Sequence, residues 1–244
     1  MSRWDCLGVK SITEHINRGD GVPPLFAMFN VMKSEFLVAR HLAYSALNHA
    51  PRETGKYSDT LDYAIYGISP AMLTTAQRTC LDLLDKVAIA TSEYLGLPGK
   101  PSGIYFTKRW FMPRKLEGPL LWQPEVERII RHRNTALIAL SDVSGDIEDG
   151  GFLQDKRAMR NSSTHRFTVL HDLGGSASRE NAAVSHHHHG TFVNQLIETL
   201  QLARAVLLYF VEMVALQEHL THGDRSRIGV LEVPAHDWIR GQDA

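Results

Sequence analysis

The sequence predicts an all-α fold, a bundle of about five helices, from three observations. Apolar residues recur at three- and four-residue steps in several segments, which is the period of an amphipathic helix. The last of these stripes begins near Phe192 and keeps its spacing over about 28 residues, which is roughly 40 Å of helix. Strands do not alternate with helices and no internal repeat is visible, so a parallel sheet with crossover helices is not expected.

The first two helices are predicted from their apolar stripes and from the residues that punctuate them. The first stripe follows Pro23 and ends before Pro51, and prolines at these places mark helix boundaries. The second helix is expected to have Ser69 as its N-cap and Pro70 in its first turn, and to stop at Gly96.

The middle of the chain is less regular. Residues 97–124 are expected to form a long ordered connection that packs its aromatic side chains against the helices, although an aromatic and basic mixture can also stack on bases. A third helix is predicted over 124–140, and the Asp- and Gly-rich residues 141–151 are predicted to form a surface loop. A fourth helix is predicted over 153–170. Residues 173–190, with four consecutive histidines, are predicted to form a flexible loop.

These elements are interpreted as one domain. We expect a single domain over residues 1–244, with a core at about 25–218 and a C-terminal extension at 219–244. A short strand is expected in that extension, around 230–233.

Composition limits the class of protein. The chain is 43% hydrophobic and 22% charged, which is typical of a soluble globular protein. Cys6 and Cys80 are too few for a disulfide framework or a zinc site. The N-terminus lacks a signal-peptide pattern, and the longest apolar stretch, 203–216, is interrupted by Glu212 and is too short to cross a bilayer. A cytoplasmic protein without membrane contact is therefore expected.

The net charge of −1 gives no general reason to expect nucleic-acid binding. The basic residues are nevertheless concentrated in two groups, the second of which surrounds residues 160–165: Lys108, Arg109, Arg114, Lys115, Arg128, Arg131 and Arg133, then Lys156, Arg157, Arg160 and Arg166. A solvated surface is the alternative explanation of such groups.

The strongest candidate site is the run from Arg160 through Asn161 to His165. His165 can act as a general base or acid near neutral pH. Arg160 offers a permanent planar charge to a phosphate, and Asn161 can orient the imidazole or donate to a phosphate oxygen. With a neighbouring 2′-OH as nucleophile, these groups could cleave RNA to a 2′,3′-cyclic phosphate without a metal ion.

The spacing alone is not specific, because Arg166 and His171 repeat it. On an ideal helix Asn161 and His165 share a face, whereas Arg160 lies about 140° from His165. Arg157 joins the shared face one turn earlier. An Arg and a His on a solvated helix face remain the alternative interpretation.

With these residues, the chain resembles the HEPN superfamily (higher eukaryotes and prokaryotes nucleotide-binding), many of whose members carry Arg-x4–6-His on their third core helix. Three further pieces are similar to one prokaryotic branch of that superfamily, and the similarity covers roughly residues 25–218: Glu35 to Arg40, Leu81 to Ala88, and Asn134 to Leu137 with Ser141 and Asp142.

The resemblance implies a HEPN-like helical bundle, usually a homodimer with both motifs near the interface. It implies catalysis by Arg160, Asn161 and His165 and substrate binding by Arg157 and Arg166. Many such proteins are ribonucleases in toxin–antitoxin, phage-defence or CRISPR-linked systems, so RNA and a co-encoded antitoxin or regulatory protein are expected partners. Other members have lost activity, which keeps a non-catalytic RNA- or nucleotide-binding module and a protein-interaction module open.

No cofactor and no metal ion is expected. The block His186 to His189 lacks the spacing that brings ligands together on one ion. Neither a glycine-rich phosphate loop nor a dinucleotide fingerprint occurs in the sequence.

Overall fold

The computed structural model describes residues 7–9, 12, 23–49, 51–113, 119–148, 150–156, 166–173 and 183–222. Within these residues the chain is mainly helical, as predicted, with a small sheet that was not predicted. The helices are α1 Pro24–Asn48, α2 Ile68–Tyr94, α3 Pro124–Arg131, α4 Thr135–Ile147 and α6 His189–His222, with 3-10 turns η2 Pro101–Gly103 and η3 Phe106–Lys108. The strands are β1 Ala64–Ile65, β2 Phe167–His171 and β3 Val184–His188.

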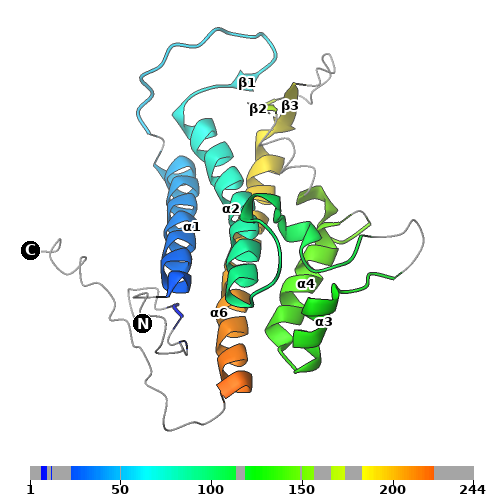
Figure 1. Ribbon diagram of the computed structural model, residues 1–244. Helices are drawn as coiled ribbons and strands as arrows, with labels where there is room; N and C mark the ends of the chain where they lie inside the picture. The colour runs from blue at the N-terminus through cyan, green and yellow to red at the C-terminus, as the bar shows by residue number, and fades with distance from the viewer. Residues whose placement is uncertain are drawn as a thin grey trace, which may run out of the picture.

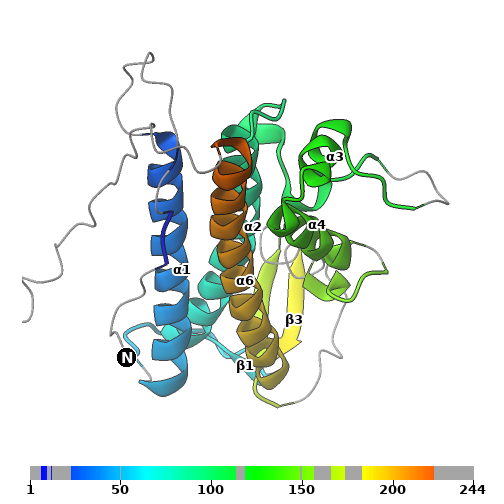
Figure 2. The same ribbon diagram turned by 90° about the horizontal axis from the view of Figure 1, so that it is seen from below.

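The three long helices α1, α2 and α6 lie side by side, and α3 and α4 pack beside α2 and α6 (Figures 1 and 2). The sheet lies at the end of the bundle where α2 and α6 begin. The core contains one face of every long helix; its largest fully buried side chains include Trp110, Phe106, Phe210, Met32, Leu73, Leu81, Leu83, Leu137, Leu140 and Leu196.

The sheet corrects two predictions. Its strand order is β1-β2-β3, with β1 antiparallel and β3 parallel to β2, and His171 is in register with His188. The predicted helix over 153–170 is therefore wrong for 167–170, which form β2, whereas 154–156 are helical. The predicted loop over 173–190 is wrong for 184–190, which form β3 and the start of α6; residues 174–182 lie outside the described part.

The predicted third helix is in fact two helices. Arg133 has φ 69°, a left-handed conformation that ends α3, and the side chain of Asn134 then caps α4 by accepting from the amide of Leu137 at 3.2 Å. The predicted loop at 141–151 is wrong for 141–147, through which α4 continues, whereas residues 148, 150 and 151 lie outside any helix. Burial of Ser144 and Ile147 against the core outweighs the Asp and Gly content of this stretch.

The ends of α2 are built differently from each other. The helix begins at Ile68, and Ile68 N donates to Glu53 Oε2 at 2.8 Å, so a carboxylate from the preceding loop does the capping predicted for Ser69. Gly96 ends the helix as predicted, with φ 63°. Leu97 N donates to Ser92 O at 2.8 Å, the long bond of a Schellman motif.

The aromatic connection packs its rings into the core, as predicted. Phe106 and Trp110 are fully buried, and their rings meet edge to face with centroids 5.6 Å apart. Both backbone polar groups of Phe106 are paired, since its N–H donates to Asp85 Oδ1 at 2.8 Å and its carbonyl accepts from Ser144 Oγ at 3.2 Å. The connection therefore joins α2 to α4.

Helix α6 is longer than the predicted last helix, with 34 residues. By length and composition alone its span His189–Thr221 could cross a membrane, because an 18-residue window within it has a mean hydropathy of 1.6. The sequence-based exclusion, which rested on the short length of the apolar stretch, therefore does not hold. Its buried face packs in the bundle, where Phe210 stacks on Phe29 of α1 with ring centroids 6.3 Å apart. A helix at the centre of a bundle needs this apolar composition.

The C-terminal region is described only in part. Helix α6 runs to His222, so the predicted extension at 219–244 begins inside a helix. Residues 223–244, with the predicted strand at 230–233, lie outside the described residues. The single domain over 1–244 stays a prediction.

Asn134 offers a test of how the helices are joined. Its buried side chain caps α4 and donates to Met213 O of α6 at 3.0 Å. We expect Asn134→Ala to lower the free energy of unfolding by about 1–3 kcal/mol, because it removes the cap and leaves buried backbone groups without a partner. Urea denaturation measures the change. Thr135→Ala at the exposed neighbouring position should stay within about 0.5 kcal/mol of wild type, and equal effects of the two variants would contradict this role.

Candidate functional site

Four of the five predicted site residues cannot be placed. Arg157, Arg160, Asn161 and His165 lie outside the described residues, which resume at Arg166. Arg166 is exposed and immediately precedes β2. The structure does describe both flanks of the run 157–165, and these flanks show how it is attached to the bundle.

The N-terminal flank is attached to α6 through a buried lysine. Lys156 is 1% exposed, and its ammonium lies 2.7 Å from Glu198 Oε2 and 3.1 Å from Asp155 Oδ2. A buried ammonium group is costly without a partner, and Glu198 supplies one from the first third of α6. The backbone just before the predicted motif is therefore held against α6.

The C-terminal flank enters the sheet. Phe167 N donates to Ala183 O at 2.8 Å, and Leu170 at the far end of β2 is buried. Because β3 leads directly into α6, this flank is also connected to the start of α6. The two described flanks, at Lys156 and at Phe167, are thus both attached near the end of the bundle where α6 begins.

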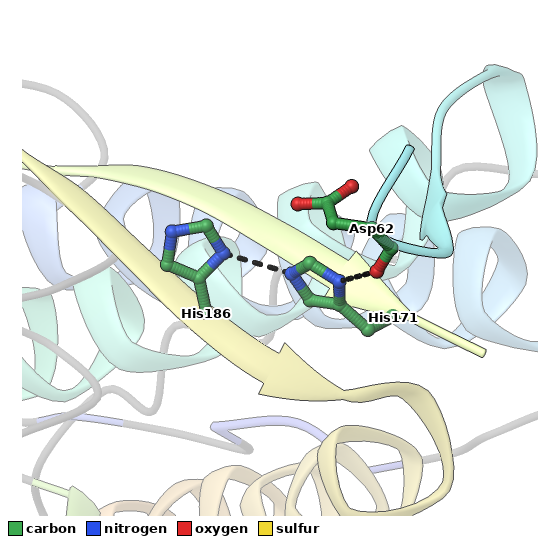
Figure 3. A group of neighbouring side chains, drawn as sticks. All are labelled: Asp62, His171 and His186. Carbon is green, nitrogen blue, oxygen red and sulfur yellow. Dashed lines mark hydrogen bonds between the residues drawn. The ribbon is translucent and has the colours of Figure 1, made fainter. Parts of the chain in front are cut away.

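The described site that sequence reasoning missed is a group of histidines in the sheet. His171 is 4% exposed, its Nδ1 lies 3.0 Å from the backbone carbonyl of Asp62, and its Nε2 lies 2.8 Å from His186 Nδ1 (Figure 3). His187 points to the other side of the strand, where its ring meets Phe192 with centroids 5.8 Å apart. Burial, with the neighbouring His186 as a smaller cause, lowers the pKa of His187.

Asp62 reaches this pair from an unusual piece of backbone. Leu61 and Tyr63 on either side of it have φ of 57° and 59°, left-handed conformations that cost of order 1–3 kcal/mol each in residues other than glycine. The pKa of the Asp62 carboxyl is lowered, first by the hydrogen bond from Thr60. The carboxylate and the two imidazoles offer ligand atoms that all lie within 4.8 Å of one another.

The sequence contains no local signal for this group. His171 and Asp62 are 109 positions apart, and His171 and His186 are 15 apart, so only the strand pairing brings them together. Within the His block, the prediction treated four neighbouring side chains as one loop. In β3 the side chains of His186, His187 and His188 alternate between two faces, His189 begins α6, and only His186 joins the group.

The sequence segments on which the family resemblance rests contain residues that connect the helices of the bundle to one another. Lys86 of α2 forms an ion pair with Glu35 of α1, and Asp85 accepts from Phe106 N at 2.8 Å. Asn134 joins α4 to α6 as described above. These contacts position helices, so the pair Asp85 and Lys86 is a structural feature.

A pocket of about 620 Å³ lies at the other end of the bundle, where α2 and α6 end beside α3. Its polar lining includes Arg128, His132 and Glu218. Tyr94 also lines it and donates to Glu218 Oε1 at 2.7 Å, and burial, with this contact, raises the pKa of its phenol. The pocket is far along α6 from Lys156 and contains none of the predicted site residues.

The contact between Lys156 and Glu198 can be tested with a double-mutant cycle. We expect Lys156→Met and Glu198→Gln to be coupled by about 1–3 kcal/mol in the free energy of unfolding, because each change removes the same charge-assisted contact. Urea denaturation of the wild type, both single variants and the double variant gives the coupling. Lys156→Met with Glu212→Gln, an exposed position on the same helix, serves as the uncoupled control. If the effects of Lys156→Met and Glu198→Gln are additive, the contact between these two residues does not stabilise the fold.

One comparison with known proteins identifies the family. A family model described as LA2681-like HEPN matches residues 16–217. No curated protein and no protein of solved structure matches the chain. A HEPN domain suggests a nuclease or an RNA-binding module. Because the match spans most of the chain, and the helical bundle agrees with the all-α fold expected of the superfamily, the protein belongs to the LA2681-like HEPN family.

Proposed function

We propose that this protein is a metal-independent endoribonuclease. The observation that carries the proposal is the sequence Arg160-Asn161 followed by His165 in a chain of a HEPN family. These three residues have the side chains that cleavage of RNA by its own 2′-OH requires, and they occur together in one short run. Arg157 and Arg166 flank the run and would bind the phosphates on either side of the scissile one.

The proposed reaction is an intramolecular transesterification, in which the phosphorus of the RNA backbone is transferred from the 5′-oxygen to the neighbouring 2′-oxygen. His165 takes the proton of the 2′-OH, whose oxygen then attacks the adjacent phosphorus. The bond from phosphorus to the 5′-oxygen breaks, and water or a second imidazole returns a proton to that leaving oxygen. Arg160 stabilises the negative charge that grows on the phosphoryl oxygens. The products are a 2′,3′-cyclic phosphate and a 5′-hydroxyl end.

The described flanks support this proposal. A catalytic run must be held by rigid elements if its side chains are to stay in a productive geometry. Lys156 is fixed to Glu198 of α6, and the residues after Arg166 form β2. Arg166 is exposed, so it is accessible to a phosphate.

We further propose a homodimer that acts on RNA in the cytoplasm, in a toxin–antitoxin or phage-defence setting with a co-encoded antitoxin or regulatory protein. The family resemblance supports this setting. Exposed apolar side chains on α1 and α6 support the dimer, because Val31, Val38, Ile197 and Leu208 are each at least 40% exposed in the single chain.

Cleavage of RNA tests the catalytic proposal. Purified wild-type protein should cleave total cellular RNA in EDTA and leave 2′,3′-cyclic ends. His165→Ala should lower the cleavage rate by about 10²- to 10⁴-fold, because it removes the proposed proton acceptor. Gel electrophoresis and end-group analysis of the fragments measure both results.

Two matched variants control for general loss of structure. His219→Ala and Arg204→Ala change exposed residues of α6 and should leave the rate unchanged, whereas Arg160→Ala should lower it. Full activity of His165→Ala would refute the catalytic role. If wild type leaves RNA intact but binds it with an affinity that falls with salt and with Arg160→Ala, the protein is a non-catalytic binding module.

The dimer is tested by the molar mass in solution. Light scattering after size-exclusion chromatography should give twice the 27.4 kDa of one chain. Leu208→Glu should shift this mass towards one chain, because it places a charge on an exposed apolar position of α6. Gln201→Glu at another exposed position of the same helix should not. A wild-type mass of one chain over micromolar concentrations would contradict the proposal.

A further inference from the structure

We propose that Asp62, His171 and His186 form a binding site for one divalent transition-metal ion, with Zn²⁺ the best match. This inference is separate from the RNA chemistry above, which uses none of these residues. The three side chains come from different places in the sequence. Asp62 precedes β1, His171 ends β2 and His186 lies in the middle of β3.

The distances suit a metal ion. His171 Nε2 and His186 Nδ1 face each other at 2.8 Å, and the carboxylate of Asp62 offers a third ligand atom within 4.8 Å of both rings (Figure 3). Two imidazoles on a tetrahedral Zn²⁺, with Zn–N bonds of about 2.0–2.1 Å, hold their nitrogens about 3.3 Å apart. The half-buried ring of His186 therefore needs to move by about half an ångström, and the carboxylate of Asp62 has to approach the two rings by up to about 1.5 Å.

His171 already has the orientation of a metal ligand. The backbone carbonyl of Asp62 can only accept a hydrogen bond, so the ring must carry its hydrogen on Nδ1. In the neutral ring this leaves the lone pair of Nε2 directed at His186. Metal-binding histidines commonly use their second nitrogen to donate to a backbone carbonyl in this way, which fixes both tautomer and orientation.

The hydrogen-bonded pair of rings and the metal-bound pair differ chemically only in the tautomer of His186 and in the ion between the rings. In the described arrangement a neutral His186 donates its Nδ1–H to the lone pair of His171. On metal binding, the proton of His186 moves from Nδ1 to Nε2, and both facing lone pairs then point at the ion. The rings stay neutral, and Asp62 supplies one negative charge.

The donor set indicates which ion fits. Two imidazole nitrogens and one carboxylate oxygen are ligands that Zn²⁺ binds well, whereas Mg²⁺ and Ca²⁺ prefer oxygen alone. Three protein ligands leave a fourth tetrahedral position for water. His188 is in register with His171, but its ring lies over Gly190 and outside the group.

An ion at this place would join all three strands of the sheet. It would connect the loop before α2, the strand that follows the predicted catalytic run, and the strand that leads into α6. Since the unfolded chain does not hold these ligands together, binding should stabilise the folded state.

The test uses the full chain, first freed of metal with a chelator and then titrated with Zn²⁺ by calorimetry. Wild type should bind one ion, and the melting temperature should rise. Co²⁺ in its place should give the visible absorption of a tetrahedral nitrogen and oxygen site. His171→Gln and Asp62→Asn should each weaken binding by at least about 10-fold and remove most of the rise in melting temperature.

The control must separate this site from the run of histidines, which can bind metal without any fold. His189→Gln removes one histidine of that run and should leave binding within twofold of wild type. Unchanged affinity in His171→Gln would overturn the proposal, since it would show adventitious binding by residues 186–189. Absence of saturable Zn²⁺ binding to wild type would also overturn it. If His171→Gln fails to fold because the residue is buried, Asp62→Asn alone decides, since its side chain is only partly buried.

Discussion

The structure depends on the need of α6 to bury one face along its whole length. Helices α1, α2 and α4 meet that face, and each is fixed to it by a specific contact. Phe29 of α1 stacks on Phe210, Gln77 of α2 donates to Thr199 at 3.0 Å, and Asn134 donates to Met213 O. Lys156 binds Glu198 at 2.7 Å. Apolar burial supplies most of the stabilisation, whereas these contacts set the position of each partner along the helix.

This arrangement explains why the sequence indicates the helices well. A helix packed along a central partner needs an apolar stripe of helical period, and that stripe is visible in one sequence. Ends that use Pro or Gly are also visible, as at Pro24 and Gly96. The break between α3 and α4 is not, because Arg133 adopts a left-handed conformation without a glycine. Asn134 is a residue type that favours N-caps, but apolar residues at helical spacing continue on both sides of it and hide the break.

The sheet is hidden in the sequence for a physical reason. Strands β2 and β3 have five residues each and β1 has two, so none shows a clear alternation. The side chains of β3 are Val, Ser and three His, which match no apolar pattern. Pairing between distant segments stabilises these strands, and single-sequence patterns do not contain that information. For the same reason the histidine group was not predicted. The motif from Arg160 to His165 is local and therefore visible in the sequence, and as a site it stays a prediction, since it lies outside the described residues.

The position of α6 late in the chain also bears on synthesis. Translation at about 5–20 residues per second needs about two to seven seconds to produce a helix of 34 residues. Until then the faces of α1, α2 and α4 that pack against α6 have no partner, although α1 and α2 can already pack against each other, and Lys156 has no Glu198 to pair with. Completion of the bundle must therefore wait for the last described helix, and the nascent chain exposes these apolar faces during that time. Lys156, which immediately precedes the proposed nuclease run, therefore cannot pair with Glu198 until α6 has emerged from the ribosome.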